Sequence, residues 1–209
     1  MAGMKLLRKA VRKIILNEGM VTMDQLPDGV SIEIWLRGAK TCIIRYMKED
    51  PVSGYLVAPN PSSDPAWGVI ILRRGFYQKG LWEVTQSSAA DGYGPLLYDI
   101  AMEYATEYGV GLVSDRHNVS DGKDGAQSVW NYYLQHRDGV DVEAHQMDDL
   151  HNTLTDTPVD NIDQSIAKKT STGIERWSDS AFSKRYTKEP TLLNKYEDKK
   201  IIYKIGSSS

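Results

Sequence analysis

Long apolar runs are missing from this chain of 209 residues. No stretch approaches the ~20 consecutive apolar residues that a transmembrane helix requires. The first residues also lack the uninterrupted apolar core of a secretory signal peptide. We therefore expect a cytoplasmic protein without a membrane span.

Cysteine is almost absent, and positive charge is not in excess. The single cysteine, Cys42, excludes an intramolecular disulfide framework and fits a reducing compartment. It lies in the apolar, strand-like run 41–44, which favours a buried thiol over a nucleophile. The formal net charge of −3 argues against a generally basic nucleic-acid binder. One weaker alternative remains, in which a basic N-terminal helix and the basic C-terminus contact nucleic acid in a salt-dependent way.

Several site motifs are missing as well. No histidine has metal-ligand spacing with cysteine or carboxylates, so no metal site is expected at His117, His136, His145 or His151. No Gly-Lys-Ser/Thr follows a glycine-rich turn, and no third glycine completes a dinucleotide fingerprint. A G-x-S-x-G nucleophile elbow is also lacking.

The chain divides into three regions. Residues 1–29 contain a basic amphipathic helix at 4–18 and a linker; the helix either docks through its apolar stripe or offers a handle to a partner. Residues 30–140 carry the strongest apolar patterns. Residues 141–209 are first acidic and then basic, and we expect a wrapping extension, partly irregular, rather than a second domain with its own core.

Apolar periodicity predicts the elements of the central region. Alternation with period two indicates an antiparallel meander of strands at 30–36, 40–47, 54–58, 67–74 and 81–86. Helical spacing follows at 95–108 and 125–136, separated by a short buried strand at 110–114 that favours parallel pairing. In the first helix, Asp99, Glu103 and Thr106 form a polar face opposite the apolar one. Helix and strand candidates also occur at 190–197 and 201–205. The predicted fold class is α+β (mixed α/β), with a mixed, mostly antiparallel sheet flanked by helices.

A Gly-Tyr-Gly turn at 92–94 joins the strand at 81–86 to the helix that follows. Glycine allows a positive φ and a close approach of the backbone to a ligand. The start of a helix offers unpaired amide hydrogens and the positive end of the helix dipole, which together attract phosphate. Asp91 directly precedes the turn, where we expect its carboxylate to cap the helix.

This order of meander, strand, G-x-G turn, helix, short strand and helix resembles the GNAT acetyltransferase superfamily. The resemblance covers about 30–136 and is tightest over 81–134; segments 92–105 and 129–133 are similar to GNAT-like proteins carried by phages. It implies acetyl-CoA as cosubstrate. In the family, a Gln/Arg-x-x-Gly-x-Gly/Ala turn binds the pyrophosphate, and the strand before it splays from the next strand and holds the pantetheine arm. The corresponding cofactor-binding residues here are Val84, Gln86, Ala89, Ala90, Asp91, Gly92, Tyr93 and Gly94.

The same resemblance implies two catalytic residues. Glu83 is the best-placed general base for an acceptor amine, and Tyr133 is placed to protonate the leaving thiolate. Each has a plain alternative: Glu83 as the solvent-facing member of an alternating strand, and Tyr133 as a core aromatic.

The leading interpretation is an acetyl-CoA-dependent N-acetyltransferase whose acceptor is an unidentified small or protein amine. The alternative is a catalytically degenerate GNAT-fold binding or structural protein of a phage, within the virion or directed at a host factor. Ala89, where the family has Gln or Arg, and the negative charge of Asp91 favour this alternative.

Overall fold

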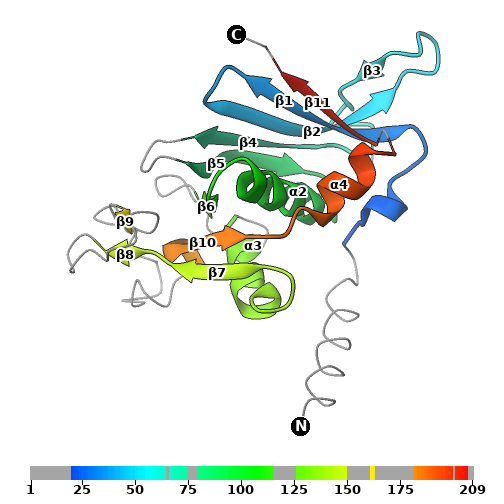
Figure 1. Cartoon of the computed structure of the whole chain (residues 1–209). Coiled ribbons are helices and arrows are strands. Elements are labelled where there is room, and N and C mark those ends of the chain that lie inside the picture. The colour runs from blue at the N-terminus through cyan, green and yellow to red at the C-terminus, as the bar shows by residue number, and fades with distance from the viewer. Residues whose placement is uncertain are drawn as a thin grey trace.

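One large mixed sheet organises the chain. The computed structural model describes residues 20–64, 66–74, 80–114, 126–149, 161–162, 181–199 and 201–206. The sheet has nine strands in the order β11-β1-β2-β4-β5-β6-β10-β7, with β3 paired to β2 outside this path (Figure 1). The α+β class and the mostly antiparallel sheet predicted from the sequence are confirmed.

In the first half of the chain, the order of strands in the large sheet follows their order in the sequence; in the second half it does not. Strands β1 (Val30–Arg37), β2 (Thr41–Glu49), β4 (Gly68–Arg74) and β5 (Leu81–Ala89) form an antiparallel series, and β3 (Leu56–Val57) pairs with the end of β2. Strand β6 (Gly111–Ser114) is parallel to β5, as expected. Strand β10 (Lys184–Thr187) then lies between β6 and β7 (Glu143–Gln146), while β11 (Ile202–Gly206) is parallel to β1. Two further short strands, β8 (Asp148–Asp149) and β9 (Asn161–Ile162), pair with each other.

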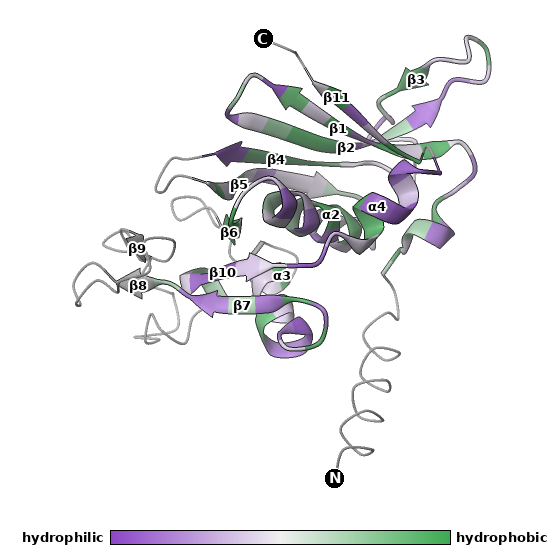
Figure 2. Cartoon of the chain, in the orientation of Figure 1, coloured by the Kyte–Doolittle hydropathy of each residue, from purple (hydrophilic) through white to green (hydrophobic). Residues whose placement is uncertain are grey.

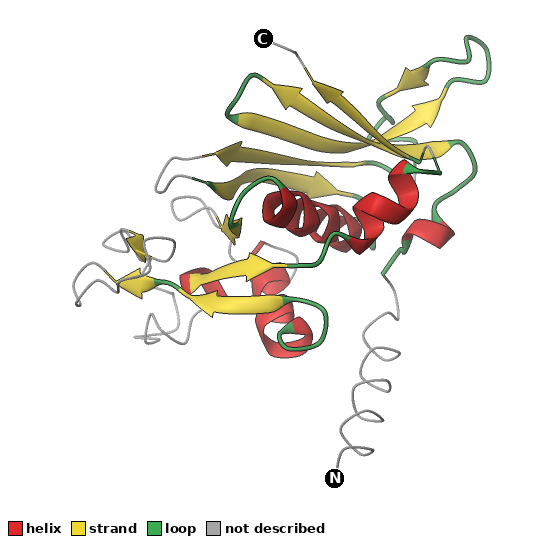
Figure 3. Ribbon diagram, viewed as in Figure 1, coloured by secondary structure: helices red, strands yellow, loops and turns green. Residues whose placement is uncertain are grey.

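The described helices pack on one face of this sheet (Figure 3). They are α2 (Gly94–Glu107), α3 (Ala126–Tyr132), which continues as the π-helical turn η2 (Tyr133–Arg137), and α4 (Thr191–Glu197). Two short 3₁₀ turns, η1 (Met23–Gln25) and η4 (Ala181–Ser183), join the same side. No helix within the described ranges is long and apolar enough to cross a membrane. The predicted helix at 4–18 lies outside the described residues.

The core lies between the sheet and α2. Because side chains alternate along a strand, Ile32 and Ile34 of β1, Ile44 of β2 and Ile70 of β4 all point to the helical face, where each is at most 1% exposed. Green bands on β1, β2 and β4 in Figure 2 follow this apolar pattern. Cys42 is buried in the same cluster, as predicted.

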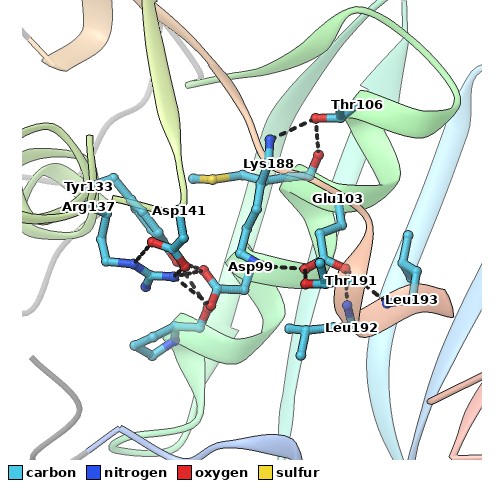
Figure 4. Close-up of polar contacts among 12 residues, drawn as sticks. Asp99, Glu103, Thr106, Tyr133, Arg137, Asp141, Lys188, Thr191, Leu192 and Leu193 are labelled. Carbon is cyan, nitrogen blue, oxygen red and sulfur yellow. Dashed lines mark hydrogen bonds and ion pairs between the residues drawn. The ribbon is translucent and has the colours of Figure 1, made fainter. Parts of the chain in front are cut away.

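Helix α2 is more buried than its sequence suggests. Glu103, predicted on a polar face, is 0% exposed because the C-terminal segment lies over it. Its carboxylate accepts hydrogen bonds from the Lys188 ammonium and from the backbone amides of Leu192 (2.7 Å) and Leu193 (2.9 Å), as Figure 4 shows. Glu103 therefore caps the start of α4 from another helix.

Strands β7, β10 and β11 of region 141–209 belong to the same sheet as residues 30–140. Strands β10 and β7 extend this sheet beyond β6, and β11 is the strand at its opposite end, next to β1. The predicted helix at 190–197 and strand at 201–205 are confirmed as α4 and β11.

Candidate functional site

The two sides of strand β5 differ in the pairing that the described residues give them. Its parallel pairing with β6 covers Leu81 to Val84 up to Ser114, the last described residue before the 115–125 gap, whereas its pairing with β4 continues to Ala89. No described residue pairs with the β6 side of residues 85–89, which we call the free edge of β5. Unpaired backbone groups on a central strand are available to hydrogen-bond a ligand.

A β-bulge marks the place where the free edge begins. Ile71 of β4 pairs with Gln86, but the next residue, Leu72, pairs with Val84, so Thr85 is the extra residue. The Thr85 hydroxyl donates to the Ile71 carbonyl at 3.2 Å. A bulge bends the strand and increases its twist locally.

The free edge is polar and open to solvent. Gln86, Ser87 and Ser88 are exposed although β5 lies in the middle of the sheet, whereas Val84 before the bulge is 5% exposed. The sequence predicted the strand only to residue 86; the pairing with β4 carries it through this polar run.

The chain passes from the free edge into the glycine turn and then into α2. Gly92 has φ +81°, the left-handed conformation for which the sequence suggested glycine. The turn is held from outside: the Gly92 carbonyl accepts from the Val21 amide (3.1 Å), and the Tyr93 carbonyl accepts from the Tyr46 hydroxyl (2.7 Å).

The start of α2 carries no side-chain cap. Tyr93 occupies the N-cap position without a capping hydrogen bond, so the prediction that Asp91 caps the helix is wrong. Asp91 lies two residues before the N-cap and is exposed. Within the described structure, the first amides of α2 thus remain available to an anion.

Glu83 lies just before the bulge, on the sheet face opposite α2. The side chain is 6% exposed, so the alternative of a solvent-facing residue is not what the structure has. Its register neighbours are Arg73 on β4 and Val113 on β6. Glu83 is therefore two residues before Thr85, where the free edge begins.

Tyr133 is a fully buried residue between α3 and α2. Its hydroxyl lies 2.8 Å from an Asp99 carboxylate oxygen and 3.1 Å from the Pro95 carbonyl. Burial, together with the nearby negative charge of Asp99, raises the pKa of Tyr133 well above its usual value. Among the described residues, no contact joins Tyr133 to Glu83 or to the free edge of β5.

A different tyrosine reaches the free edge. The Tyr98 hydroxyl lies 2.9 Å from the Ser87 hydroxyl, and its ring packs edge-on against Trp130. Burial raises the pKa of Tyr98, while the Ser87 hydrogen bond opposes the rise. Sequence reasoning missed this residue because it lies on the apolar face of α2; its contact with Ser87 depends on the extension of β5 past the bulge.

Two cavities described in the structure lie away from the free edge. A cavity of about 230 Å³ is formed by residues 20–23, the start of α2, Arg137 and α4, and one of about 270 Å³ lies between the 139–143 turn and residues 187–189. Among the charged residues that line them, Arg137 binds Asp99 and Asp141, and Lys188 binds Glu103. The described residues contain no group of His, Cys, Asp and Glu that could hold a metal ion.

Comparison with known proteins adds no relative: no protein-family model, curated protein or solved structure matches this chain.

Proposed function

We propose that this protein binds acetyl-CoA along the free edge of β5 and transfers the acetyl group to an amine. The observation that carries the proposal is the exposed polar run Gln86–Ser88 on a strand in the middle of the sheet, followed by a glycine turn and a helix start without a side-chain cap. The order of meander, strand, G-x-G turn, helix, short strand and helix, for which the chain resembles the GNAT superfamily, supports the same site. The acceptor amine is small or proteinaceous.

The geometry supports a distinct role for each part of the site. On one side of residues 85–89, where no described residue pairs with β5, backbone groups would hold the pantetheine arm. The pyrophosphate then lies at Gly92–Gly94, where helix amides and the helix dipole favour negative charge. Asp91 opposes this charge, but its side chain is exposed and is not fixed by a capping bond.

The chemical step is direct attack of the acceptor nitrogen on the thioester carbonyl. Glu83 takes a proton from the attacking amine, the C–S bond breaks, and the CoA thiolate takes a proton from a tyrosine hydroxyl. The resemblance assigns that hydroxyl to Tyr133. The contact between the Tyr98 and Ser87 hydroxyls favours Tyr98 instead.

Thermal unfolding with acetyl-CoA tests the binding step. Acetyl-CoA at about 100 times its dissociation constant should stabilise the fold by about 2.7 kcal/mol. For a chain of this size, that corresponds to a rise in Tm of about 5–10 °C. No rise at millimolar acetyl-CoA would exclude the proposed function.

Gly94 offers a matched pair of variants for the same measurement. A Cβ at Gly94 would meet only the Ala89 Cβ, at 3.8 Å, so both Gly94→Ala and Gly94→Asp fit the backbone. Gly94→Ala should keep the ligand-induced rise in Tm, and Gly94→Asp should remove it by placing a negative charge beside the pyrophosphate. An unchanged rise in Gly94→Asp would place the ligand elsewhere.

Single-turnover transfer to an amine separates the catalytic residues from the binding residues. Glu83→Gln should keep the Tm rise with acetyl-CoA and slow transfer by roughly 10²- to 10⁴-fold. Tyr98→Phe and Tyr133→Phe are compared in the same assay, and the slower variant identifies the acid. Binding without transfer to any amine would instead support the non-catalytic GNAT-fold alternative.

A further inference from the structure

Ser114, the last described residue of β6, has a buried hydroxyl without a hydrogen-bond partner. The residue is 1% exposed, and its oxygen has no partner in the part of the chain that the structure describes. A buried polar group that is left unpaired is costly, and native structures rarely keep one without a reason. An atom of a ligand can supply the missing partner.

The register of β6 places this hydroxyl beside the start of the free edge of β5. Ser114 is in register with Val84, the residue directly before the bulge at Thr85. Residues in register on neighbouring strands project to the same face. Because Val84 belongs to the core on the α2 side, Ser114 projects to that side as well. Its hydroxyl therefore lies at the end of the free edge that is farther from the glycine turn.

Two further hydroxyls lie on the same side of the free edge. Because Thr85 is an extra residue, Ser87 is in register with the core residue Ile70 and projects to the α2 side. Its hydroxyl lies 2.9 Å from that of Tyr98 on α2. Ser87 and Tyr98 thus pair with each other, whereas the Ser114 hydroxyl is left for a ligand.

The length of the free edge determines which part of acetyl-CoA meets Ser114. With the pyrophosphate at Gly92–Gly94, the pantetheine arm runs back along residues 89–85, a distance of about 17 Å for an extended strand. The thioester at its far end then lies next to Val84, with which Ser114 is in register. On the basis of the proposed function, we propose that the Ser114 hydroxyl donates a hydrogen bond to the carbonyl oxygen of this thioester.

A hydrogen bond at this oxygen stabilises the charge that develops during transfer. When the acceptor nitrogen attacks the carbonyl carbon, the π electrons of the C=O bond move onto the oxygen, which becomes an oxyanion. The Ser114 hydroxyl stabilises this oxyanion and keeps its own proton. The C=O bond then re-forms, the C–S bond breaks, and its electrons leave with the CoA sulfur as a thiolate. Ser114 is thus a catalytic residue that acts by charge stabilisation rather than by proton transfer.

Isotope-edited infrared spectroscopy of bound acetyl-CoA tests this contact without a known acceptor. A heavy-isotope label at the thioester carbonyl carbon separates that C=O stretch from the protein bands. Because a hydrogen bond weakens the C=O bond, the stretch should lie at lower frequency in the wild type than in Ser114→Ala. Titration should also show an affinity for acetyl-CoA that is roughly 2- to 10-fold lower in Ser114→Ala. The affinity for CoA, which has no thioester carbonyl, should be unchanged.

Ser31 of β1 provides the matched control. It is also a buried serine, 6% exposed, whose hydroxyl has no partner among the described residues, and β2 and β4 separate its strand from β5. Ser31→Ala should leave the carbonyl stretch and both affinities unchanged. Because each variant removes a buried hydroxyl without a partner, neither should lower the Tm of the unliganded protein. A lower Tm in Ser114→Ala alone would overturn the inference, since the hydroxyl would then have a structural partner.

The outcomes separate the Ser114 contact from the proposed function. A lower-frequency stretch that Ser114→Ala abolishes and Ser31→Ala keeps supports the contact. If the wild type binds acetyl-CoA but Ser114→Ala changes neither the stretch nor the affinity, the contact is refuted and the proposed function stands. If the wild type does not bind acetyl-CoA, the proposed function fails and the Ser114 contact fails with it.

Discussion

At the scale of single residues, burial decides the chemistry of the one cysteine. Cys42 is fully buried against α2 beside the Tyr104 hydroxyl, and burial raises its pKa from 9.0 to about 12. The thiolate, not the thiol, is the reactive form. Since the folded pKa is the higher one, this thiol's contribution to stability is complete below about pH 9 and is lost as the pH approaches 12.

We therefore expect Cys42 to resist alkylation in the native protein at pH 8. Reaction with a thiol reagent should follow the rate of global unfolding, and it should become immediate in denaturant. Fast labelling under native conditions would contradict a rigid core around β2, and a Cys42→Ala variant provides the unreactive control.

Two acidic residues illustrate how far residue roles can be predicted from sequence. Asp91 has the residue type and the local position of a helix cap, yet the N-cap position of α2 is Tyr93, two residues later, and the helix start has no side-chain cap. Glu103 has the position of a surface residue, yet it caps α4, which begins 88 residues further along the chain. Local spacing cannot report a partner that tertiary packing brings from the other end of the sequence.

At the scale of elements, the buried pair of Glu103 and Lys188 fastens the C-terminal segment to α2. Both side chains are nearly fully buried, at 0% and 6% exposure. Burial is the largest influence on Glu103 and raises its pKa, while the Lys188 charge opposes the rise. A buried charge is costly when it loses its partner.

Lys188→Met should consequently destabilise the protein by about 3–5 kcal/mol, because it leaves the Glu103 carboxylate buried and unpaired. The double variant Glu103→Leu/Lys188→Met should cost much less, about 1 kcal/mol, chiefly from the lost cap on α4. Urea unfolding of both singles and the double gives the coupling energy. Additive effects would mean that the two side chains do not act as a pair.

Sequence patterns predicted where helices and strands lie better than they predicted which strands pair with each other. Strands β1, β2 and β4 were predictable because one face is buried and the other is not, which forces alternation. The extension of β5 to Ala89 was not, because Gln86–Ser88 is a polar run that, among the described strands, pairs with β4 alone. The exposed polar run therefore escaped prediction: it depends on the bulge at Thr85 and on the pairing with β4.

At the scale of the whole molecule, the last third of the chain interleaves with the rest. Strand β10 lies between β6 and β7, and β11 pairs with β1 at the opposite end of the sheet. Periodicity identified β11 and α4 as elements, but strand order depends on long-range pairing that no local pattern encodes. A wrapping extension and an integral part of the sheet differ in one measurable respect, which is whether residues 1–140 fold without the remainder.

We expect the fragment 1–140 not to fold cooperatively. Four of the large side chains that the missing segment adds to the main core are at most 2% exposed: Tyr186, Leu193, Tyr196 and Ile202. At about 1.5–3 kcal/mol each, their burial is worth about 6–12 kcal/mol, which is comparable to the whole net stability of a domain, about 5–15 kcal/mol. Near-UV circular dichroism and urea unfolding of 1–140 should lack a sharp transition. A control ending at Gly206 keeps β11 and should unfold as the full chain does. If 1–140 instead shows a native near-UV spectrum and a cooperative transition, β7, β10 and β11 are a separable addition to a self-sufficient sheet.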